Sequence, residues 1–446
     1  MNKTTIELPT LKEIEIDLFK LLQETFGTTM TDVLQELDQQ IAETRDKRRF
    51  QLKDKRTVTM DCMFGSIEIT RNYYYDRETN KYVCLLDQYL QFEGTKGLSP
   101  LVQEAAIEMA VTGTSYRHAA KMIETLLGYA VMSHETIRQH LLQTEVIQRS
   151  SEMPERRVLF VEVDGLYVKR QEKGKKSREE KIAAVHEGWQ VNGKRTRLVG
   201  KRHYHHKGKE PFWEGFERFL MDTYAYNPNE HFLIINGDGA QWITACRQHF
   251  KNIFFTIDRF HVAQDIRRIF KEHKRYRAIR KKLANFDGEG LLVELNSAVG
   301  TLNDEKKEEL LEGLINQLSK YPEGLGNYRD WLVANGVDTT GMRTMGASES
   351  TMRVFAKRLK NGRAWSEKGL LPFIDAMIAF NDDLDIKTVM GTIFNRLEDE
   401  EEPNPPKYYK EKITKSVVEA KRQNIGYLQN TSGKPIYQTL KAIQGF

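Results

Sequence analysis

The sequence predicts an α/β RNase H-like domain that carries a helical insertion and follows an α+β region containing a helix-turn-helix. Two observations lead to this fold class. From about residue 157, apolar runs rich in β-branched residues alternate with segments of helical periodicity. Before that point, helical patterns surround one stretch in which apolar and polar residues alternate. We therefore expect an α+β part followed by an α/β part.

The first 97 residues are expected to form a helical region over 1–56 and a small β hairpin over 57–97. Apolar residues recur at helical spacing in the first range. In the second range they alternate with polar residues, at Val58, Met60 and Cys62. Three consecutive tyrosines follow at 73–75. They could stack on bases, although packing against neighbouring helices is the favoured interpretation.

Residues 98–150 are expected to contain a helix-turn-helix that binds DNA. Gly128 can end the first helix in the left-handed conformation, and Ser133 can cap the start of the second. Side chains suited to base edges and phosphates would lie on the exposed faces, namely Arg117, His134, Arg138 and Gln139. An ordinary helical hairpin remains the alternative.

The catalytic core is expected over residues 156–262. Its strands are predicted near residues 157–170, 181–191, 195–206, 231–237 and 252–258. Its helices are predicted at residues 211–224 and 240–250. The resulting order, β-β-β-α-β-α-β, is that of an RNase H-like fold.

Three further regions complete the division of the chain. Residues 263–340 are expected to be a helical insertion with loops at 287–290 and 321–324. Residues 341–395 are expected to complete the core with a helix. Residues 396–446 begin with an acidic run and three prolines, a composition typical of a solvated linker and tail.

Three acidic residues give the strongest functional signal. Asp164 interrupts an apolar strand, and Asp238 ends another strand between two glycines. A buried strand aspartate is costly unless it is paired or binds a cation, and open α/β sheets bind ligands at the carboxyl ends of their strands. Glu349 opens a helical segment far downstream. Two strand aspartates and a distant helical glutamate can hold two divalent metal ions for phosphoryl transfer.

Each of these acids also has a purely structural interpretation. Asp238 could be a turn residue, because Asp-Gly pairs are common in turns. Glu349 could pair with Arg353, one helical turn further on. An Asp-Gly step occurs at Asp164 as well, and its recurrence in one α/β unit favours function over the turn interpretation.

Asp258 and His261 follow the next predicted strand. Asp258 could cap the helix that begins there. His261 could approach a metal site or a phosphate, or it could simply pack at the junction between strand and helix. Spacing alone leaves both interpretations of His261 open.

Basic residues concentrate in three segments, 194–209, 267–282 and 353–368. Residues 267–282 contain nine basic residues against one acid, and residues 194–209 contain seven with no acid. Solvated helix faces or strand edges would explain such runs, but interleaved aromatic residues suit a surface that follows phosphates. DNA contacts are expected from Arg267, Arg268, Lys274, Arg275, Arg353, Arg358 and Lys360.

Composition sets only broad limits on the environment of the chain. The formal net charge of +5 is mildly basic and is weak evidence for nucleic acid. No apolar run approaches the roughly 20 residues of a membrane span, and no export signal is evident at the N-terminus. The three cysteines are widely spaced and suit a reducing cytoplasm. We expect a cytoplasmic protein, associated with the nucleoid when it binds DNA, and no membrane partner.

The motifs resemble the DDE transposases of bacterial insertion sequences. The ISLre-type group, related to the mutator-like transposases and often classed as uncharacterised conserved proteins, is the nearest in pattern. The resemblance runs from about residue 10 to 390. Its motifs are TVTMDCMFGSIEITRNYYYD (57–76), GTSYRHAAKMI (113–123), VEVDGLYV (161–168), NGDGAQWI (236–243), DRFHV (258–262) and GASESTMRVFAKRLKNGRAWSEKG (346–369).

The resemblance implies a transposase that cleaves DNA at the element ends and transfers the strands to target DNA. Asp164, Asp238 and Glu349 would be its catalytic acids and would hold two Mg²⁺ or Mn²⁺ ions. Asp258 and His261 match the family-like Asp-x-x-His element. The partners would be the terminal inverted repeats and target DNA, both double-stranded, and the protein would be a homo-oligomer in the DNA complex.

Other functions stay open at this point. The chain could be an RNase H-like nuclease without transposition, or a domesticated DNA-binding protein without catalysis. A weaker alternative is a metal-binding scaffold built on His203, His205 and His206, for which no nearby acidic or thiol ligand is evident.

Overall fold

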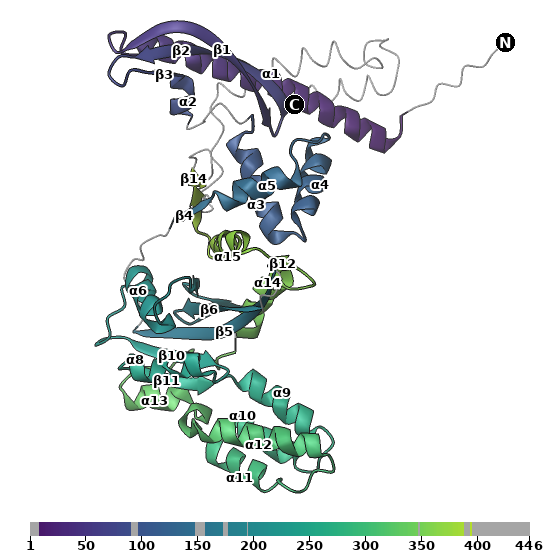
Figure 1. The fold of residues 1–446 in the computed structure, drawn as a ribbon, viewed down its shortest axis with the longest axis vertical. Helices are drawn as coiled ribbons and strands as arrows, with labels where there is room; N and C mark the ends of the chain where they lie inside the picture. The colour runs from purple at the N-terminus through teal and green to yellow at the C-terminus, as the bar shows by residue number, and fades with distance from the viewer. Residues whose placement is uncertain are drawn as a thin grey trace, which may run out of the picture. The chain divides into compact units, whose positions relative to one another are not determined.

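The computed structural model describes residues 9–90, 97–147, 157–172, 177–193, 195–346, 348–387 and 393–394. The chain divides into two compact units, Met1–Glu145 with Ile386–Phe446 and Val146–Asp385 (Figure 1). Within the described ranges, no helix combines the length and the apolar character that crossing a membrane requires. The expected linker and tail, 396–446, lies outside the described residues.

The first unit begins with a long helix packed on a three-stranded sheet. Helix α1 (Leu11–Thr44) starts at a capping box in which Thr10 and Glu13 bond to each other's backbone N–H groups. Its apolar side chains and the strands share a core of Leu34, Met60, Cys62, Ile67, Ile69 and Leu86. The strands are β1 (Phe50–Cys62), β2 (Gly65–Asp76) and β3 (Lys81–Val83), in the order β1-β2-β3.

The hairpin was expected to begin at residue 57, but β1 begins at Phe50. After the half-buried Phe50, residues 51–56 are exposed and lack an apolar alternation, so their pattern carried no strand signal. They are held instead by cross-strand pairing, from Phe50 opposite Asp76 to Arg56 opposite Arg71.

Short helices complete the first unit. They are α2 (Leu85–Tyr89), α3 (Pro100–Thr112), α4 (Tyr116–Leu127) and α5 (His134–Leu142). Gly128 ends α4 with φ 82°, and the Ser133 hydroxyl accepts the Thr136 N–H at the start of α5. Both predicted caps are therefore confirmed as local structure.

The second unit is built on a mixed sheet with the order β11-β10-β5-β6-β9. Its strands are β5 (Val158–Arg170), β6 (Arg178–His186), β9 (Arg202–His205), β10 (Phe232–Gly237) and β11 (Ile253–Ile257). Strands β5, β6 and β9 pair antiparallel, whereas β10 runs parallel to both β5 and β11. A short strand, β12 (Ala364–Trp365), pairs in parallel with the far end of β5.

Three predicted elements of this unit are divided in the structure. The strand expected at 181–191 stops at His186, and its last residues belong to a separate strand that begins at Trp189. The strand expected at 195–206 is two strands, because Gly200 adopts a left-handed conformation with φ 57° between them. Only β9 joins the large sheet, and β8 (Arg195–Leu198) pairs with β7 (Trp189–Asn192) in a separate ribbon. The helix expected at 240–250 is two short helices, α7 (Gln241–Thr244) and α8 (Cys246–His249).

Helices cover both faces of the mixed sheet. Helix α6 (Phe212–Tyr224) packs on the face that presents Leu159 and Val161. Helix α13 (Tyr328–Ala334) packs on the opposite face, against Val158 and Phe160. Figure 1 shows a helical arm extending from β11, formed by α9 (Arg259–Phe270), α10 (Tyr276–Ala284), α11 (Gly288–Asn296) and α12 (Glu305–Ser319).

The two loops expected in the helical insertion are helical in the structure. Asp287 caps α11 by accepting the Gly290 N–H at 2.8 Å, so residues 288–290 form the first turn of that helix. Pro322–Leu325 is a 3-10 helix, η1. The remaining elements are α14 (Ser348–Leu359), α15 (Glu367–Asn381), β4 (Glu145–Ile147), β13 (Asp385–Lys387) and β14 (Ile393–Phe394).

Candidate acidic active site

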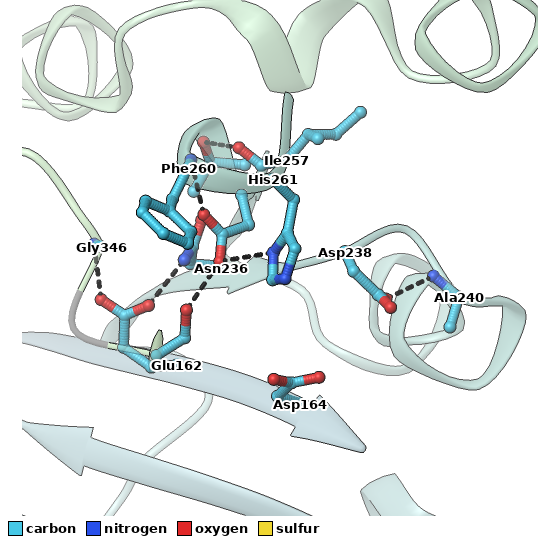
Figure 2. A network of polar contacts seen from close by, with 12 residues as sticks. Glu162, Asp164, Asn236, Asp238, Ala240, Ile257, Phe260, His261 and Gly346 are labelled. Atoms are coloured by element: carbon cyan, nitrogen blue, oxygen red, sulfur yellow. Dashed lines mark hydrogen bonds and ion pairs between the residues drawn. The ribbon is translucent and has the colours of Figure 1, made fainter. Parts of the chain in front are cut away.

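The strand register brings Asp164 and Asp238 to the same level of the mixed sheet. Asn236 of β10 lies opposite Glu162 of the parallel strand β5. Side chains two residues apart on an extended chain point to the same side, so Asp164 and Asp238 follow this pair on one face. Figure 2 shows both carboxylates pointing into one space beside the imidazole of His261.

Asp164 is held in a setting that disfavours its charge. Burial raises the pKa of its carboxyl to about 6, a 2.7 Å hydrogen bond from the Gly165 N–H lowers it, and the negative charge of Asp238 raises it. The protonated imidazole of His261 acts in the opposite direction. A cation between the two aspartates would relieve this repulsion and favour the ionised form of Asp164.

The backbone around Asp238 is closely packed. Its Oδ1 accepts the Ala240 N–H at 2.9 Å, and its carbonyl oxygen accepts the Gln317 side-chain amide at 2.6 Å. A Cβ on Gly237 would lie 2.6 Å from Ile243 Cγ2, which is closer than van der Waals contact allows. Glycine before Asp238 is therefore required by packing, which fixes where the carboxylate projects.

Asp258 and His261 border the same space. Asp258 is 1% exposed and caps α9, with Oδ1 accepting the Phe260 N–H at 2.8 Å. Its Oδ2 accepts the Ser348 hydroxyl at 2.6 Å and lies 3.1 Å from His261 Nδ1. The structure thus places His261 beside the acids, which was one of the two interpretations left open by its spacing.

This contact sets the charges of both groups. Burial raises the pKa of Asp258, but contacts with His261, Ser348 and the Phe260 N–H outweigh it, and the net shift is downward. The contact with Asp258 raises the pKa of His261 to about 9 against the effect of burial, and the charges of Asp164 and Asp238 add to the rise. At neutral pH the site therefore contains an imidazolium among carboxylates.

Glu162 is a site residue that the sequence reasoning did not identify. It is fully buried, its Oε2 accepts the Asn236 side-chain amide at 2.6 Å, and its Oε1 accepts the Gly346 N–H at 2.9 Å (Figure 2). The bond from Gly346 to Glu162 and the bond from Ser348 to Asp258 attach the start of α14 and the residues before it to the sheet. A charged residue in an apolar strand, the signal that selected Asp164, is present at Glu162 as well.

Glu349 stands in the first turn of α14, next to the anchored Ser348, and is exposed. Its side chain has no hydrogen bond or ion pair within the described ranges, so the expected alternative of a pair with Arg353 is not formed. Across the described residues, no three His, Cys, Asp or Glu side chains gather closely enough to hold a metal ion. Asp164 and Asp238 supply the oxygen donors that Mg²⁺ prefers, but as a pair rather than a triad.

The basic residues expected to bind DNA differ in exposure. Arg267 and Arg268 line a groove of about 500 Å³ on the helical arm, together with Lys271, Lys307 and the acids Asp265 and Glu272. Lys274, Arg353 and Lys360 are exposed, while Arg275 is half-buried and paired with Glu294 at 2.9 Å.

Arg358 corrects the sequence-based expectation. It is 6% exposed, and its guanidinium lies 4.5 Å from the ring centre of Phe373 and 5.6 Å from that of Trp365. Its charge is stacked inside the fold of the second unit and is not presented at the surface, so it is not a direct DNA contact in this conformation.

In the first unit, the candidate DNA-reading residues are only partly available. Arg117 and His134 are exposed. Arg138 is engaged by Glu135, with its Nε 2.9 Å and its Nη2 2.6 Å from the carboxylate oxygens. Gln139 contacts the same carboxylate at 3.4 Å. Glu135 would have to release these side chains before they could contact bases.

His203 and His205 of β9, and His206 directly after it, do not form a shared metal-binding site. His203 Nδ1 lies 2.5 Å from Asp382, and His205 Nε2 lies 3.0 Å from Glu180. His206 instead contacts the Tyr204 hydroxyl at 2.9 Å. Acidic partners are thus present, brought by distant elements, but His203 and His205 each have a different one and His206 contacts a tyrosine.

The chain matches the sequence profile of the uncharacterised protein family UPF0236 over residues 5–392. It belongs to the UPF0236 family. A relative from Streptococcus gallolyticus, the UPF0236 protein in the vanSb 3′ region, is 25% identical over 390 residues, covering 84% of each chain.

UPF0236 proteins of Caldanaerobacter subterraneus subsp. tengcongensis are similarly related. One is 24% identical over 423 residues, covering 92% of this chain and 87% of its own, and its name joins eleven gene labels. Among solved structures, the chain is similar to one from the Drosophila P element transposase strand transfer complex, with 11% identity and a TM-score of 0.24 over 63% of this chain and 77% of that chain.

Proposed function

We propose that this UPF0236 chain is a DDE transposase of an ISLre-type bacterial insertion sequence. It would cleave DNA at the element ends and join the strands to target DNA in a metal-dependent reaction. The observation that carries the proposal is the register that sets Asp164 and Asp238 side by side on one face, where β10 ends beside the middle of β5.

The chain order of the second unit supports an RNase H-like core. Three antiparallel strands, β5, β6 and β9, are followed by α6, β10, two short helices and β11. This is the predicted β-β-β-α-β-α-β order, with the second helix divided. The helical arm then occupies the interval before α14, where the resemblance to transposases places an insertion.

The names of the relatives give independent support. One relative's name joins eleven gene labels from a single strain, and another joins four. A protein encoded at many places in one genome is what copies of a mobile element would produce. A host enzyme with a fixed role does not require this multiplicity.

In the proposed reaction, Asp164 and Asp238 would hold a divalent cation, and Glu349 would have to approach them from the start of α14 to supply a third carboxylate. Bound Mg²⁺ or Mn²⁺ would supply activation of the attacking water or 3′-OH and stabilisation of the leaving oxygen. Glu162 and Asp258 keep the segment before Glu349 on the sheet. His261 carries a positive charge that can face a phosphate oxygen, and no serine or tyrosine nucleophile is required.

Double-stranded DNA would be the partner, both as terminal inverted repeats and as target, and pairing two ends would require a homo-oligomer. The basic groove of Arg267, Arg268 and Lys271 suits phosphates of such a duplex. The α4–α5 hairpin would contribute to recognition of the ends.

A strand-transfer assay tests the proposal. The purified protein is incubated with Mg²⁺ or Mn²⁺, a target plasmid and labelled DNA from both flanks of its own gene. Asp238→Asn is compared with Asp222→Asn, which changes an exposed aspartate of α6 outside the site. We expect joined products from the wild type and Asp222→Asn only.

The other outcomes separate the rival functions. Cleavage without joining would replace the transposase with a nuclease. Specific binding of the ends with neither product would indicate a DNA-binding protein without catalysis. Joining that survives Asp238→Asn at the wild-type level would overturn the assignment of the acidic site.

A further inference from the structure

The outer face of the β1–β2–β3 sheet carries three tyrosine rings in mutual contact. From residue 72 the even-numbered side chains of β2 are buried, with Tyr74 fully buried, so Tyr73 and Tyr75 lie on the outer side. Tyr82 of β3 pairs with Tyr75 and is 54% exposed. Its ring stacks on Tyr73, with centres 5.4 Å apart and planes at 12°, and lies 5.2 Å from Tyr75.

Cations lie over these rings. The Arg56 guanidinium is 4.6 Å from the ring centre of Tyr73, and Lys53 Nζ is 5.7 Å from that of Tyr75. The strand register shifts between Leu52 and Asp54, which leaves Lys53 as the extra residue of a bulge. Asp54, opposite Tyr73, lies 3.8 Å from Arg56, and residues 50–57 carry three cations against this one acid.

Tyr74 is fully buried, which agrees with the favoured interpretation of the tyrosine run as packing, whereas Tyr73 and Tyr75 are half-buried. Tyr82 is exposed, and cations lie over the two half-buried rings. Aromatic rings beside cations are how proteins bind single strands without base-specific contacts. A duplex hides its base faces in the stack and would not use such rings.

We propose that the tyrosine face, defined as Lys53, Arg56, Tyr73, Tyr75 and Tyr82, binds single-stranded DNA. Unpaired bases stack on the exposed part of the tyrosine rings, and Lys53 and Arg56 contact the phosphates. The binding does not depend on the acidic site, so Asp164→Asn should bind single strands as the wild type does. Failure of the proposed transposase activity would leave this inference untouched.

Fluorescence anisotropy of the full chain with a fluorescein-labelled 20-nucleotide oligothymidylate tests the site. Tyr82→Leu removes the ring, Tyr82→Phe keeps it, and Tyr89→Leu changes a tyrosine of α2 that is 66% exposed. We expect Tyr82→Leu to raise the dissociation constant about fivefold to a hundredfold. Tyr82→Phe and Tyr89→Leu should bind like the wild type, and equal melting temperatures would show that all variants are folded.

The second unit also has basic surfaces, so a second experiment must show where on the chain the single strand binds. A probe containing 5-iododeoxyuridine is cross-linked by light, and the modified peptide is identified by mass spectrometry. Cross-links on Tyr82 or Tyr73 support the proposal. It is overturned if cross-links map only elsewhere, if Tyr82→Leu binds like the wild type, or if Tyr82→Leu weakens a 20-base-pair duplex as much as the single strand.

Discussion

Glu162 Oε2 accepts a 2.6 Å hydrogen bond from Asn236 Nδ2, across the two parallel strands that carry Asp164 and Asp238. The same carboxylate accepts the Gly346 N–H at 2.9 Å with its other oxygen. One buried side chain therefore joins the two strands of the candidate site to the segment that begins α14. Asp258 makes a second connection through Ser348.

Glu162→Gln should destabilise the second unit and impair the proposed reaction. A glutamine can place only one oxygen between the Asn236 amide and the Gly346 N–H, so one buried donor loses its acceptor. We expect a loss of about 1–3 kcal/mol in the free energy of unfolding. Urea unfolding measures it, with the exposed Glu214→Gln of α6 as control. Equal losses in both variants would contradict the role of Glu162.

Asp164→Asn should raise stability at alkaline pH. The folded-state pKa of Asp164, about 6, lies above its ordinary value of 3.8, so the unfolded chain ionises first and the fold loses stability as pH rises through this interval. Removing the charge should restore up to about 3 kcal/mol at pH 8 and almost nothing at pH 4. Denaturant unfolding across this pH range checks it, and a less stable Asp164→Asn at pH 8 would refute the argument.

Divalent cations should raise the melting temperature of the wild type and leave those of Asp164→Asn and Asp238→Asn nearly unchanged. A cation that binds only the folded site raises the melting temperature with concentration. We expect Mn²⁺ to do so at pH 7.5 for the wild type and Asp222→Asn, and to have little effect on Asp164→Asn and Asp238→Asn. The shift should fade below about pH 6, as Asp164 takes up a proton. An equal shift in all four proteins would place the cation elsewhere.

His261 should titrate near pH 9, far above an ordinary histidine. Its pKa is raised because Asp258 and the other two acids stabilise the imidazolium. The stability that it contributes is full below about pH 6.5 and is lost as pH rises through 9. NMR titration should show this midpoint, and Asp258→Asn should move it down. Saturating Mg²⁺ should lower it too, since a bound cation repels the imidazolium, and a midpoint near 6.5 in the wild type would contradict the described contacts.

Arg358→Ala should lower the stability of the fold, whereas Lys360→Ala should lower the affinity for duplex DNA. Arg358 is buried over two aromatic rings, so its loss should cost about 2 kcal/mol or more of stability. Lys360 is exposed, and its loss should change stability by less than about 0.5 kcal/mol while lowering duplex DNA affinity and its salt dependence. Thermal unfolding and anisotropy at two salt concentrations separate them. A stable Arg358→Ala with weakened DNA binding would restore the original assignment of that residue.

Local sequence patterns predicted the type of most helices and strands. The alternation at 58–62, the caps Gly128 and Ser133, and the apolar runs ending at Asp238 and Asp258 each correspond to structure of the predicted type. Errors occurred where local chemistry was ambiguous. Residues 50–56 form a strand without apolar alternation, and Asp287 starts a helix where Asp-Gly suggested a loop.

The sequence by itself determined the type of most elements and the chemistry of the acids, because periodicity, caps and side-chain charge are local properties. Only the tertiary structure decided which residues meet. The register of β5 and β10 puts Glu162 opposite Asn236, so that Asp164 and Asp238 follow on one face, and packing buries Arg358. Such contacts depend on strand pairing and burial between segments far apart in the chain, and no local pattern encodes them.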